Sequence, residues 1–268
     1  EVLGRYKRRS AEVDEAITSA YVQGVSTRKM GKVTSALMGE TVSRSTVSRV
    51  TKSLEEKVEA LRREPLTQRF PYLYLDATFL DARWARAVEN VSALVAYGVV
   101  EDGHRQLLAI TIGASESQDA WADLLRQLVE RGLAGVQLVI ADGHAGLAAA
   151  ARQALPEAKL QRCTVHLTRN VLAKAPWRLR ARLGRETSAI FEAPGLKEAR
   201  ARLDALVAGL GKQVPEAMEC LVEGFAAATQ FFAFPKAHWK RLRSTNGLER
   251  LHEEVKRRIR SVCAFPDR

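Results

Sequence analysis

Two short apolar segments that each carry one aspartate constrain the fold of this chain most. FPYLYLDATF (70–79) holds Asp76 among aromatic and aliphatic residues, and VQLVIAD (136–142) runs straight into Asp142. Both segments have the composition of buried strands. A carboxylate inside an apolar strand is costly unless it is paired, hydrogen-bonded or bound to a metal. If the two strands are neighbours in one sheet, their carboxylates can converge, although an aspartate such as Asp142 taken alone is more often a turn residue.

The segments around these strands predict a mixed sheet with helices on its faces. Asp102-Gly103 is a typical turn signal between two strands, and residues 115–132 place their apolar side chains on one face of a helix. The predicted elements are strands over 70–79, 91–100 and 105–114, a helix over 115–132, a strand over 136–142, a helix over 144–155 and a strand over 158–166. This order combines an antiparallel hairpin with parallel crossovers, which predicts a mixed α/β sheet. If the first and fourth strands are neighbours at its centre, with Asp76 and Asp142 on them, the layout is that of an RNase H-like fold.

Residues 10–64 predict three helices, over 10–24, 26–39 and 43–64. A short helix, a turn that contains Gly39 and a second helix rich in Ser, Thr and Arg form the pattern of a helix-turn-helix region. That second helix would present five polar residues to a DNA groove or to phosphates: Arg44, Ser45, Ser48, Arg49 and Lys52. An ordinary helical hairpin with a solvated face is the alternative, and we favour DNA binding.

The last third of the chain, after about residue 167, predicts helices to the end. It is rich in Arg, Ala and Leu, and prolines and glycines interrupt it. A turn at residues 245–247 precedes a final helix that carries Glu249, Glu253 and Glu254.

The net charge of +11 is unevenly distributed. Residues 1–70 carry a net charge of +5, residues 71–160 of −4 and residues 161–268 of +10. Basic flanks suit a polyanion such as DNA, and an acidic centre suits metal-binding carboxylates, although a solvated surface explains the charge alone equally well. Trp177 and Trp239 lie in basic stretches, where each either stacks on DNA or anchors a helix; we favour the anchor.

The cysteines and the apolar runs bear on the compartment. Cys163, Cys220 and Cys263 lie far apart without a Cys-x-x-Cys pair, which favours a reducing compartment and argues against the usual zinc site. No apolar run is long enough to span a bilayer, and no secretory signal opens the sequence. We expect a cytoplasmic protein with no membrane partner. Because the first residue is Glu1 rather than Met, we also expect a fragment of a longer protein.

Four motifs carry a family resemblance: YLYLDATF around Asp76, VIADGHAGL around Asp142, QRCTVHLTRN from Gln161 and STNGLERLHEEVKRRIR from Ser244. With the helix SQDAWADLLRQLVERGL they cover roughly residues 20–265. On these residues the chain resembles the DDE transposases of bacterial insertion sequences in the Mutator-like (mutase) family. The resemblance implies a helix-turn-helix DNA-binding region over 1–66 and an RNase H-like catalytic domain over 67–268, interrupted by an all-helical insertion at about 170–240.

The resemblance also implies catalytic acids at Asp76, Asp142 and Glu249. They would hold two Mg²⁺ ions, for which Mn²⁺ can substitute. Two such ions clamp the attacking and leaving oxygens of an in-line phosphoryl transfer, and Mg²⁺ prefers oxygen ligands. Glu249 is selected because the family motif places its acid three residues after Asn246; Glu253, one helical turn further on, is the alternative.

Four further residues are predicted to support this site. The family has a Cys-x-x-His signature, here Cys163 and His166, which implies a structural or substrate-positioning role. A zinc half-site is the weaker interpretation, because no second ligand pair lies nearby in the sequence. His144 either contacts phosphate or caps the local turn, and Asn246 completes the supporting set.

These features predict a DNA transposase that cleaves DNA at the ends of an insertion sequence and joins them to a target. Its partners would be double-stranded DNA, as terminal inverted repeats and target, and a second copy in a homodimer. Arg257, Arg258 and Arg260 would track the DNA backbone. We expect a bacterial, nucleoid-associated protein. An RNase H-like nuclease that cleaves without joining and a catalytically silent DNA-binding protein are the alternatives.

Overall fold

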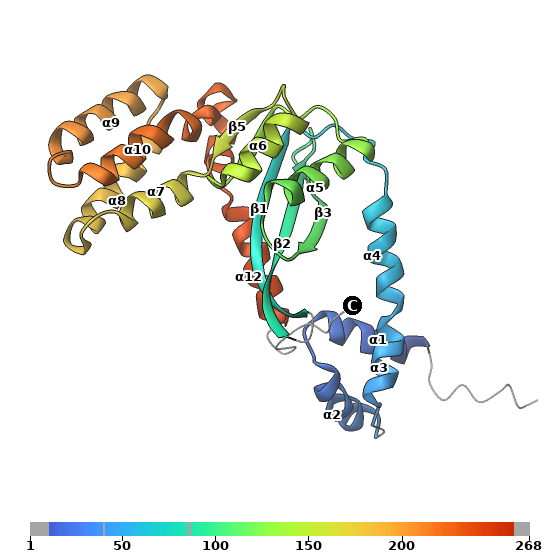
Figure 1. The fold of residues 1–268 in the computed structure, drawn as a ribbon. Coiled ribbons are helices and arrows are strands. Elements are labelled where there is room, and N and C mark those ends of the chain that lie inside the picture. The colour runs from blue at the N-terminus through green and yellow to red at the C-terminus, as the bar shows by residue number, and fades with distance from the viewer. Residues whose placement is uncertain (1–10, 40, 85–86, 260–268) are drawn as a thin grey trace, which may run out of the picture. The chain divides into compact units, whose positions relative to one another are not determined.

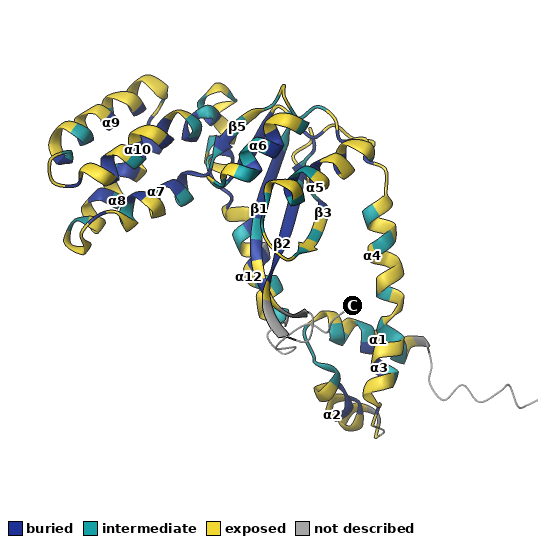
Figure 2. Ribbon diagram, viewed as in Figure 1, coloured by how far each residue is buried: buried dark blue, intermediate teal, exposed yellow. Residues whose placement is uncertain are grey.

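The computed structural model describes residues 11–39, 41–84 and 87–259. The chain divides into two compact units. One comprises residues 1–64, 80–90 and 251–268, and the other comprises residues 65–79 and 91–250. The elements are drawn in Figure 1, and the burial of their residues in Figure 2. The predicted domain boundaries stay a prediction.

The described part of the first unit begins with helices whose caps are visible in the sequence. They are α1 (Ala11–Val22), α2 (Thr27–Met38), α3 (Arg44–Thr51) and α4 (Ser53–Arg63). The side chains of Ser26 and Ser43 accept backbone N–H groups and so cap α2 and α3. Ile17, Met30 and Val47 are buried together and form the core of these helices.

The single helix predicted over residues 43–64 is wrong, because the chain forms two helices there. At the junction, the N–H of Lys52 donates to the carbonyl of Arg49, three residues back, at 3.3 Å. This tighter bond interrupts the regular i→i−4 ladder, and α4 starts at the next residue.

Among the described residues, a five-stranded sheet supports the second unit. Its strands are β1 (Tyr72–Trp84), β2 (Ala87–Val99), β3 (Arg105–Gly113), β4 (Leu138–Ala141) and β5 (Lys159–Arg162). The strand order is β3-β2-β1-β4-β5. β2 and β3 are antiparallel, whereas β4 is parallel to both β1 and β5. The predicted mixed α/β sheet is therefore confirmed.

Helices α5 (Gln118–Glu130) and α6 (Ala145–Ala154) lie over this sheet (Figure 1). Trp121, Leu124 and Leu128 of α5 are fully buried against the strands, as its apolar spacing predicts. Ser117 caps α5 by accepting the N–H of Ala120, so this helix begins three residues after the predicted start at Ser115.

The chain after β5 is helical within the described residues, as predicted. The helices are α7 (Thr164–Ala173), α8 (Trp177–Phe191), α9 (Leu196–Leu210), α10 (Pro215–Ala228), α11 (Trp239–Leu242) and α12 (Asn246–Ile259), with short 3₁₀ turns η1 (Gln230–Ala233) and η2 (Lys236–His238). Helices α7 to α10 bury a second apolar core of their own, which is the dark stripe along them in Figure 2. None of the described helices is long and apolar enough to cross a membrane.

The strand predicted to continue to His166 is wrong beyond Arg162. The N–H of Cys163 still donates to the sheet, to the carbonyl of Ala141 at 2.7 Å. The carbonyl of Cys163, however, already accepts the N–H of Leu167 at 3.0 Å, which is the first bond of α7. Cys163 therefore caps a helix, and His166 lies in its first turn.

The two tryptophans in basic stretches differ in the structure. Trp239 anchors its segment as predicted: its indole N–H donates to the carbonyl of Phe234 at 2.7 Å, and its ring contacts Phe231 and Phe232. The same prediction is wrong for Trp177, whose side chain is 83% exposed at the start of α8.

Candidate active site

Parallel pairing of β1 and β4 brings Asp76 and Asp142 together. Tyr74 lies opposite Ile140, and the same register continued by two residues sets Asp76 beside Asp142. Asp76 is buried within β1, and Asp142 is half-buried immediately after β4. The two carboxylates predicted as a pair thus lie near each other where β4 ends alongside β1.

Burial and neighbouring charges raise the pKa of Asp76 to about 7. Burial is the largest cause, and the negative charges of Asp142 and Glu249 add to it. His166 and the backbone N–H of Ala77, which donates to Asp76 at 3.1 Å, act in the opposite direction. A cation bound among these acids would relieve the same repulsion.

Asp142 is both a turn residue and a member of this acidic pair. Its carboxylate accepts the backbone N–H of His144 at 2.9 Å, which closes the turn between β4 and α6. The imidazole Nδ1 of His144 accepts the N–H of Leu147 at 3.3 Å and so caps α6. The capping role predicted as one option for His144 is therefore present, and phosphate contact stays a prediction.

Glu249 lies in the first turn of α12. One of its carboxylate oxygens is 2.9 Å from Nη1 of Arg169 and 3.8 Å from Nε2 of His166. Its effect on the pKa of Asp76 shows that it acts in the same electrostatic field as the aspartates. The alternative acid Glu253 is exposed on α12, and its neighbour Glu254 pairs with Arg257 at 2.7 Å.

Cys163 joins the start of α7 to the residues that precede α12. Its buried sulfur accepts the backbone N–H of Thr245 at 3.4 Å and the hydroxyl of Thr245 at 3.5 Å. Next to it, the N–H and hydroxyl of Thr164 both donate to the carbonyl of Arg243, at 2.8 and 2.9 Å. These contacts fix the segment from which Glu249 projects, so the structure gives Cys163 an anchoring position.

His166 lies between this anchor and the acids. Its interaction with the Cys163 thiol is the largest cause of a raised pKa of His166, and the charges of Asp76 and Asp142 raise it further, while burial opposes them. Burial raises the pKa of the Cys163 thiol, but the contacts with His166 and Thr245 outweigh it and lower that pKa. Cys163 and the two aspartates thus all shift the pKa of His166 in the same direction.

A family model described as "Transposase, Mutator family" matches residues 1–268. The chain belongs to the Mutator family of transposases. Similar members are the transposase for insertion sequence element ISRM5 of Rhizobium meliloti (strain 1021), 39% identical, and the transposase for IS1081 of Mycobacterium tuberculosis (strain ATCC 25618 / H37Rv), 37% identical. Each alignment covers 100% of this chain, which spans 67% and 65% of the length of those relatives. The resemblance found in the four motifs is confirmed.

A comparison of folds adds nothing to this assignment. A chain of the simian T-cell lymphotropic virus intasome, in complex with PP2A regulatory subunit B56 gamma, matches with a TM-score of 0.23 at 10% identity, over 85% of this chain and 72% of that chain. A TM-score this low carries no argument about the fold.

In this Mutator-family chain, the predicted DNA-binding residues lie on α3 with its C-terminal cap and on α12, the helix of Glu249. Those of α3 and its C-terminal cap are all exposed: Arg44, Ser45, Ser48, Arg49 and Lys52. Arg257 and Arg258 on α12 both pair with Glu254 at 2.7 Å, and Arg260 lies outside the described residues. Asn246, the first residue of α12, is exposed.

The motif QRCTVHLTRN supplies two cations that the sequence analysis missed. Besides Arg169, which holds Glu249, Arg162 lies at the end of β5 with its guanidinium against the turn that follows Asp142. A methyl group added at Gly143 would be 2.8 Å from its Cζ, and one at Gly224 would be 3.0 Å from Nη1. Its Nε is buried without a hydrogen bond to any described residue. The signal available in the sequence was that Arg162 and Arg169 both lie within this motif.

The acids suit a hard divalent cation by their chemistry. Asp76, Asp142 and Glu249 offer only carboxylate oxygens, and their mutual repulsion appears in the pKa of Asp76. As the side chains stand, no group of three or more His, Cys, Asp or Glu in the described part of the chain is arranged to hold a metal ion. Glu249 is instead paired with Arg169.

Proposed function

We propose that this chain is the catalytic region of a DNA transposase that cleaves insertion-sequence ends and joins them to target DNA. The observation that carries the proposal is the position of Asp76 on β1 and of Asp142 directly after the parallel strand β4, with Glu249 acting on the pKa of Asp76. Transposases for insertion sequences are also what its relatives are named.

Asp76, Asp142 and Glu249 would hold two Mg²⁺ ions, or Mn²⁺ in their place. Such ions, when bound, stabilise the charge that develops on the attacking and leaving oxygens of a phosphodiester. For this role Glu249 must leave Arg169, a half-exposed partner whose ion pair is weak enough to exchange. The metal would also keep Asp76 ionised at neutral pH, because a nearby cation favours the charged carboxylate.

The chain's own cations would position the DNA. Arg162, without an ion-pair partner among the described residues, presents its guanidinium near Asp142, where a scissile phosphate would lie. A planar guanidinium matches two phosphate oxygens at once. Water and then a 3′-hydroxyl would be the successive nucleophiles, so that cleavage and joining use one site.

The remaining assignments complete the proposal. The sheet and its helices would form an RNase H-like domain, and α2 and α3 a helix-turn-helix whose exposed polar residues contact terminal inverted repeats. Arg257 and Arg258 would contact the DNA backbone. Two DNA ends must be processed together, which suits a homodimer associated with the bacterial nucleoid in the cytoplasm.

Cleavage and joining of DNA that carries the element's own ends test this proposal, using the full-length protein with Mg²⁺ or Mn²⁺. The variants are Asp142→Asn and Asp204→Asn, the latter an exposed aspartate on α9. We expect joined products from wild type and Asp204→Asn and none from Asp142→Asn. Cleavage without joining would indicate the nuclease alternative, and end binding without chemistry in every protein would indicate a silent DNA-binding protein.

A further inference from the structure

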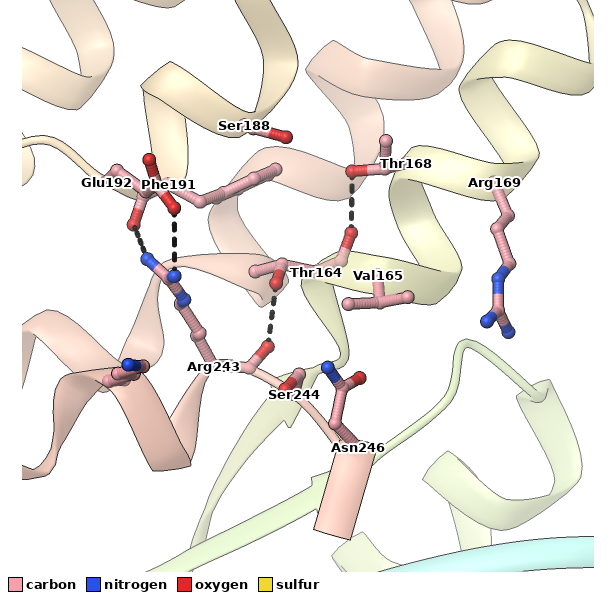
Figure 3. A pocket seen from close by; sticks show the side chains of 11 residues that line it. Thr164, Val165, Thr168, Arg169, Ser188, Phe191, Glu192, Arg243, Ser244 and Asn246 are labelled. Atoms are coloured by element: carbon pink, nitrogen blue, oxygen red, sulfur yellow. Dashed lines mark hydrogen bonds and ion pairs between the residues drawn. The ribbon is translucent and has the colours of Figure 1, made fainter. Parts of the chain in front are cut away.

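A pocket of about 390 Å³ opens between α7, α8, α11 and the segment that leads into α12. Its volume lies within the range of about 300–1,000 Å³ that is usual for ligand sites. Figure 3 shows Arg243 and Arg169 on opposite sides of it, with Asn246 below. Nothing in the proposed chemistry uses this space.

The charge of the pocket favours an anion. Three cations line it, Arg169, Lys240 and Arg243, against one acid, Glu192. Arg243 is fixed in the wall, because it pairs with Glu192 at 3.0 Å and donates to the carbonyl of Phe191 at 3.2 Å. Lys240 is exposed and has no ion pair or hydrogen bond to any residue that the structure describes. Its ammonium is available to a bound phosphate.

The uncharged lining suits the sugar and base of a nucleotide. The hydroxyls of Ser188 and Ser244 and the amide of Asn246 line the pocket, and their side chains make no hydrogen bond within the described residues. Val165 and Phe191 add a small apolar wall. Free donors and acceptors around an apolar wall are what fixes a ligand that has both polar edges and a flat ring.

Arg169 connects this pocket to the acids. It lines the pocket, and its guanidinium is 2.9 Å from the carboxylate of Glu249. Asn246, also in the lining, lies one helical turn before Glu249 on α12. The pocket therefore adjoins the acids through Arg169, and a DNA strand whose scissile phosphate lies at the acids can continue into it.

We propose that this pocket binds a single unstacked nucleotide of the DNA strand next to the scissile phosphate, with Lys240 paired to its phosphate. The inference rests on the proposed function, since it takes the acids as the place where the strand is cut. Taking a base out of the stack costs free energy, least where the base is mismatched or already unpaired. The pocket would thus favour DNA whose end is already frayed.

The test combines protein variants with neutral phosphates in the DNA. Wild type, Lys240→Ala, Lys240→Arg and the control Lys197→Ala, an exposed lysine on α9, are titrated with element-end DNA in Ca²⁺. A methylphosphonate is placed at each position near the cleavage site in turn. We expect Lys240→Ala to weaken binding about tenfold and Lys240→Arg to restore it. At one position the methylphosphonate should weaken DNA binding by wild type and by Lys197→Ala, but should cause no further loss of binding in Lys240→Ala.

A second readout follows the base itself. A 2-aminopurine at that position should brighten on binding of wild type, because it leaves the stack, and stay quenched with Lys240→Ala. The pocket proposal would be overturned if the methylphosphonate and Lys240→Ala lowered DNA affinity additively at every position. It would also be overturned if Lys240→Ala bound DNA as Lys197→Ala does. Because both readouts need no cleavage, failure of the proposed function appears separately, as absent products in Mg²⁺ despite the expected coupling.

Discussion

The two aspartates and the glutamate reach the candidate site by different means. Asp76 and Asp142 are set by backbone pairing between two parallel strands, which fixes their spacing as soon as the sheet forms. The position of Glu249 depends instead on contacts between the start of α7 and the segment before α12. These contacts join Cys163 to Thr245, which lies 82 residues further along the chain. The comparison indicates that backbone pairing sets the first pair, whereas the position of the third acid depends on hydrogen bonds between segments far apart in the sequence.

The largest effect should come from the two aspartates. Asp76→Asn is expected to lower the rate of DNA cleavage by at least about a thousandfold, because a neutral amide neither holds a divalent cation nor stabilises its charge. Single-turnover cleavage in Mg²⁺ measures this, with Asp204→Asn as the control. A loss of less than tenfold would contradict the assignment of Asp76.

The raised pKa of Asp76 predicts a stability that depends on pH in metal-free protein. The folded state holds the proton up to about pH 7, whereas an unfolded aspartate releases it near pH 4. The folded state therefore binds more protons, and its free energy of unfolding should fall by about 2–4 kcal/mol as the pH rises from 4 to 7. Urea unfolding in EDTA across this range measures the slope.

Variants show whether the Asp76 carboxyl causes this pH dependence. Asp76→Asn should flatten most of the slope, and Asp204→Asn should leave it unchanged. Removing Glu249 as Glu249→Gln should reduce the slope only in part, since burial is the larger cause of the shift. A slope that survives in Asp76→Asn would assign the titration to another group.

Removing the Cys163 thiol, which anchors the segment before Glu249, should lower both the stability and the cleavage rate. Cys163→Ala leaves the N–H and hydroxyl of Thr245 without their sulfur acceptor, which should lower the free energy of unfolding by about 1–3 kcal/mol. Cleavage should fall about tenfold as Glu249 loses its position. Cys220→Ala, at a half-buried cysteine in α10, is the matched control. Full activity in Cys163→Ala would show that the anchor does not position Glu249.

The smallest change in stability should follow loss of the ion pair at Glu249. Arg169 is 59% exposed, and such pairs contribute about 0–1 kcal/mol. Arg169→Ala should therefore change the free energy of unfolding by less than about 0.5 kcal/mol, as should Arg182→Ala, which breaks a similarly exposed pair with Glu186. Only Arg169→Ala should alter the cleavage rate. Equal rates for both variants would remove Arg169 from the site.

The sequence predicted the parts of this site that rest on local pattern. Apolar strands that each carry one aspartate predicted the sheet and the pairing of Asp76 with Asp142. The motif spacing selected Glu249 over its neighbours, and the structure places it in the field of the aspartates. The prediction of the sheet succeeds because strand pairing needs no knowledge of side-chain packing, whereas the roles of the three acids stay predictions.

The remaining features depended on tertiary contacts. Thr164 and Val165 are β-branched and favoured a strand, yet the carbonyl of Cys163 accepts a helical bond and α7 begins there. Arg162 is one cation among 42 lysines and arginines, and only its burial beside Gly143 distinguishes it. The exposure of Trp177 likewise cannot be read from the basic stretch around it.

The most direct test of the account is whether the three acids bind one metal site together. Mn²⁺ binding to the full-length protein can be followed by electron paramagnetic resonance, for wild type, Asp142→Asn, Glu249→Gln and Asp204→Asn. The account predicts that Asp142→Asn and Glu249→Gln each weaken Mn²⁺ binding by tenfold or more, and that Asp204→Asn does not. Equal Mn²⁺ affinity in all four proteins would contradict a metal site shared by the three acids.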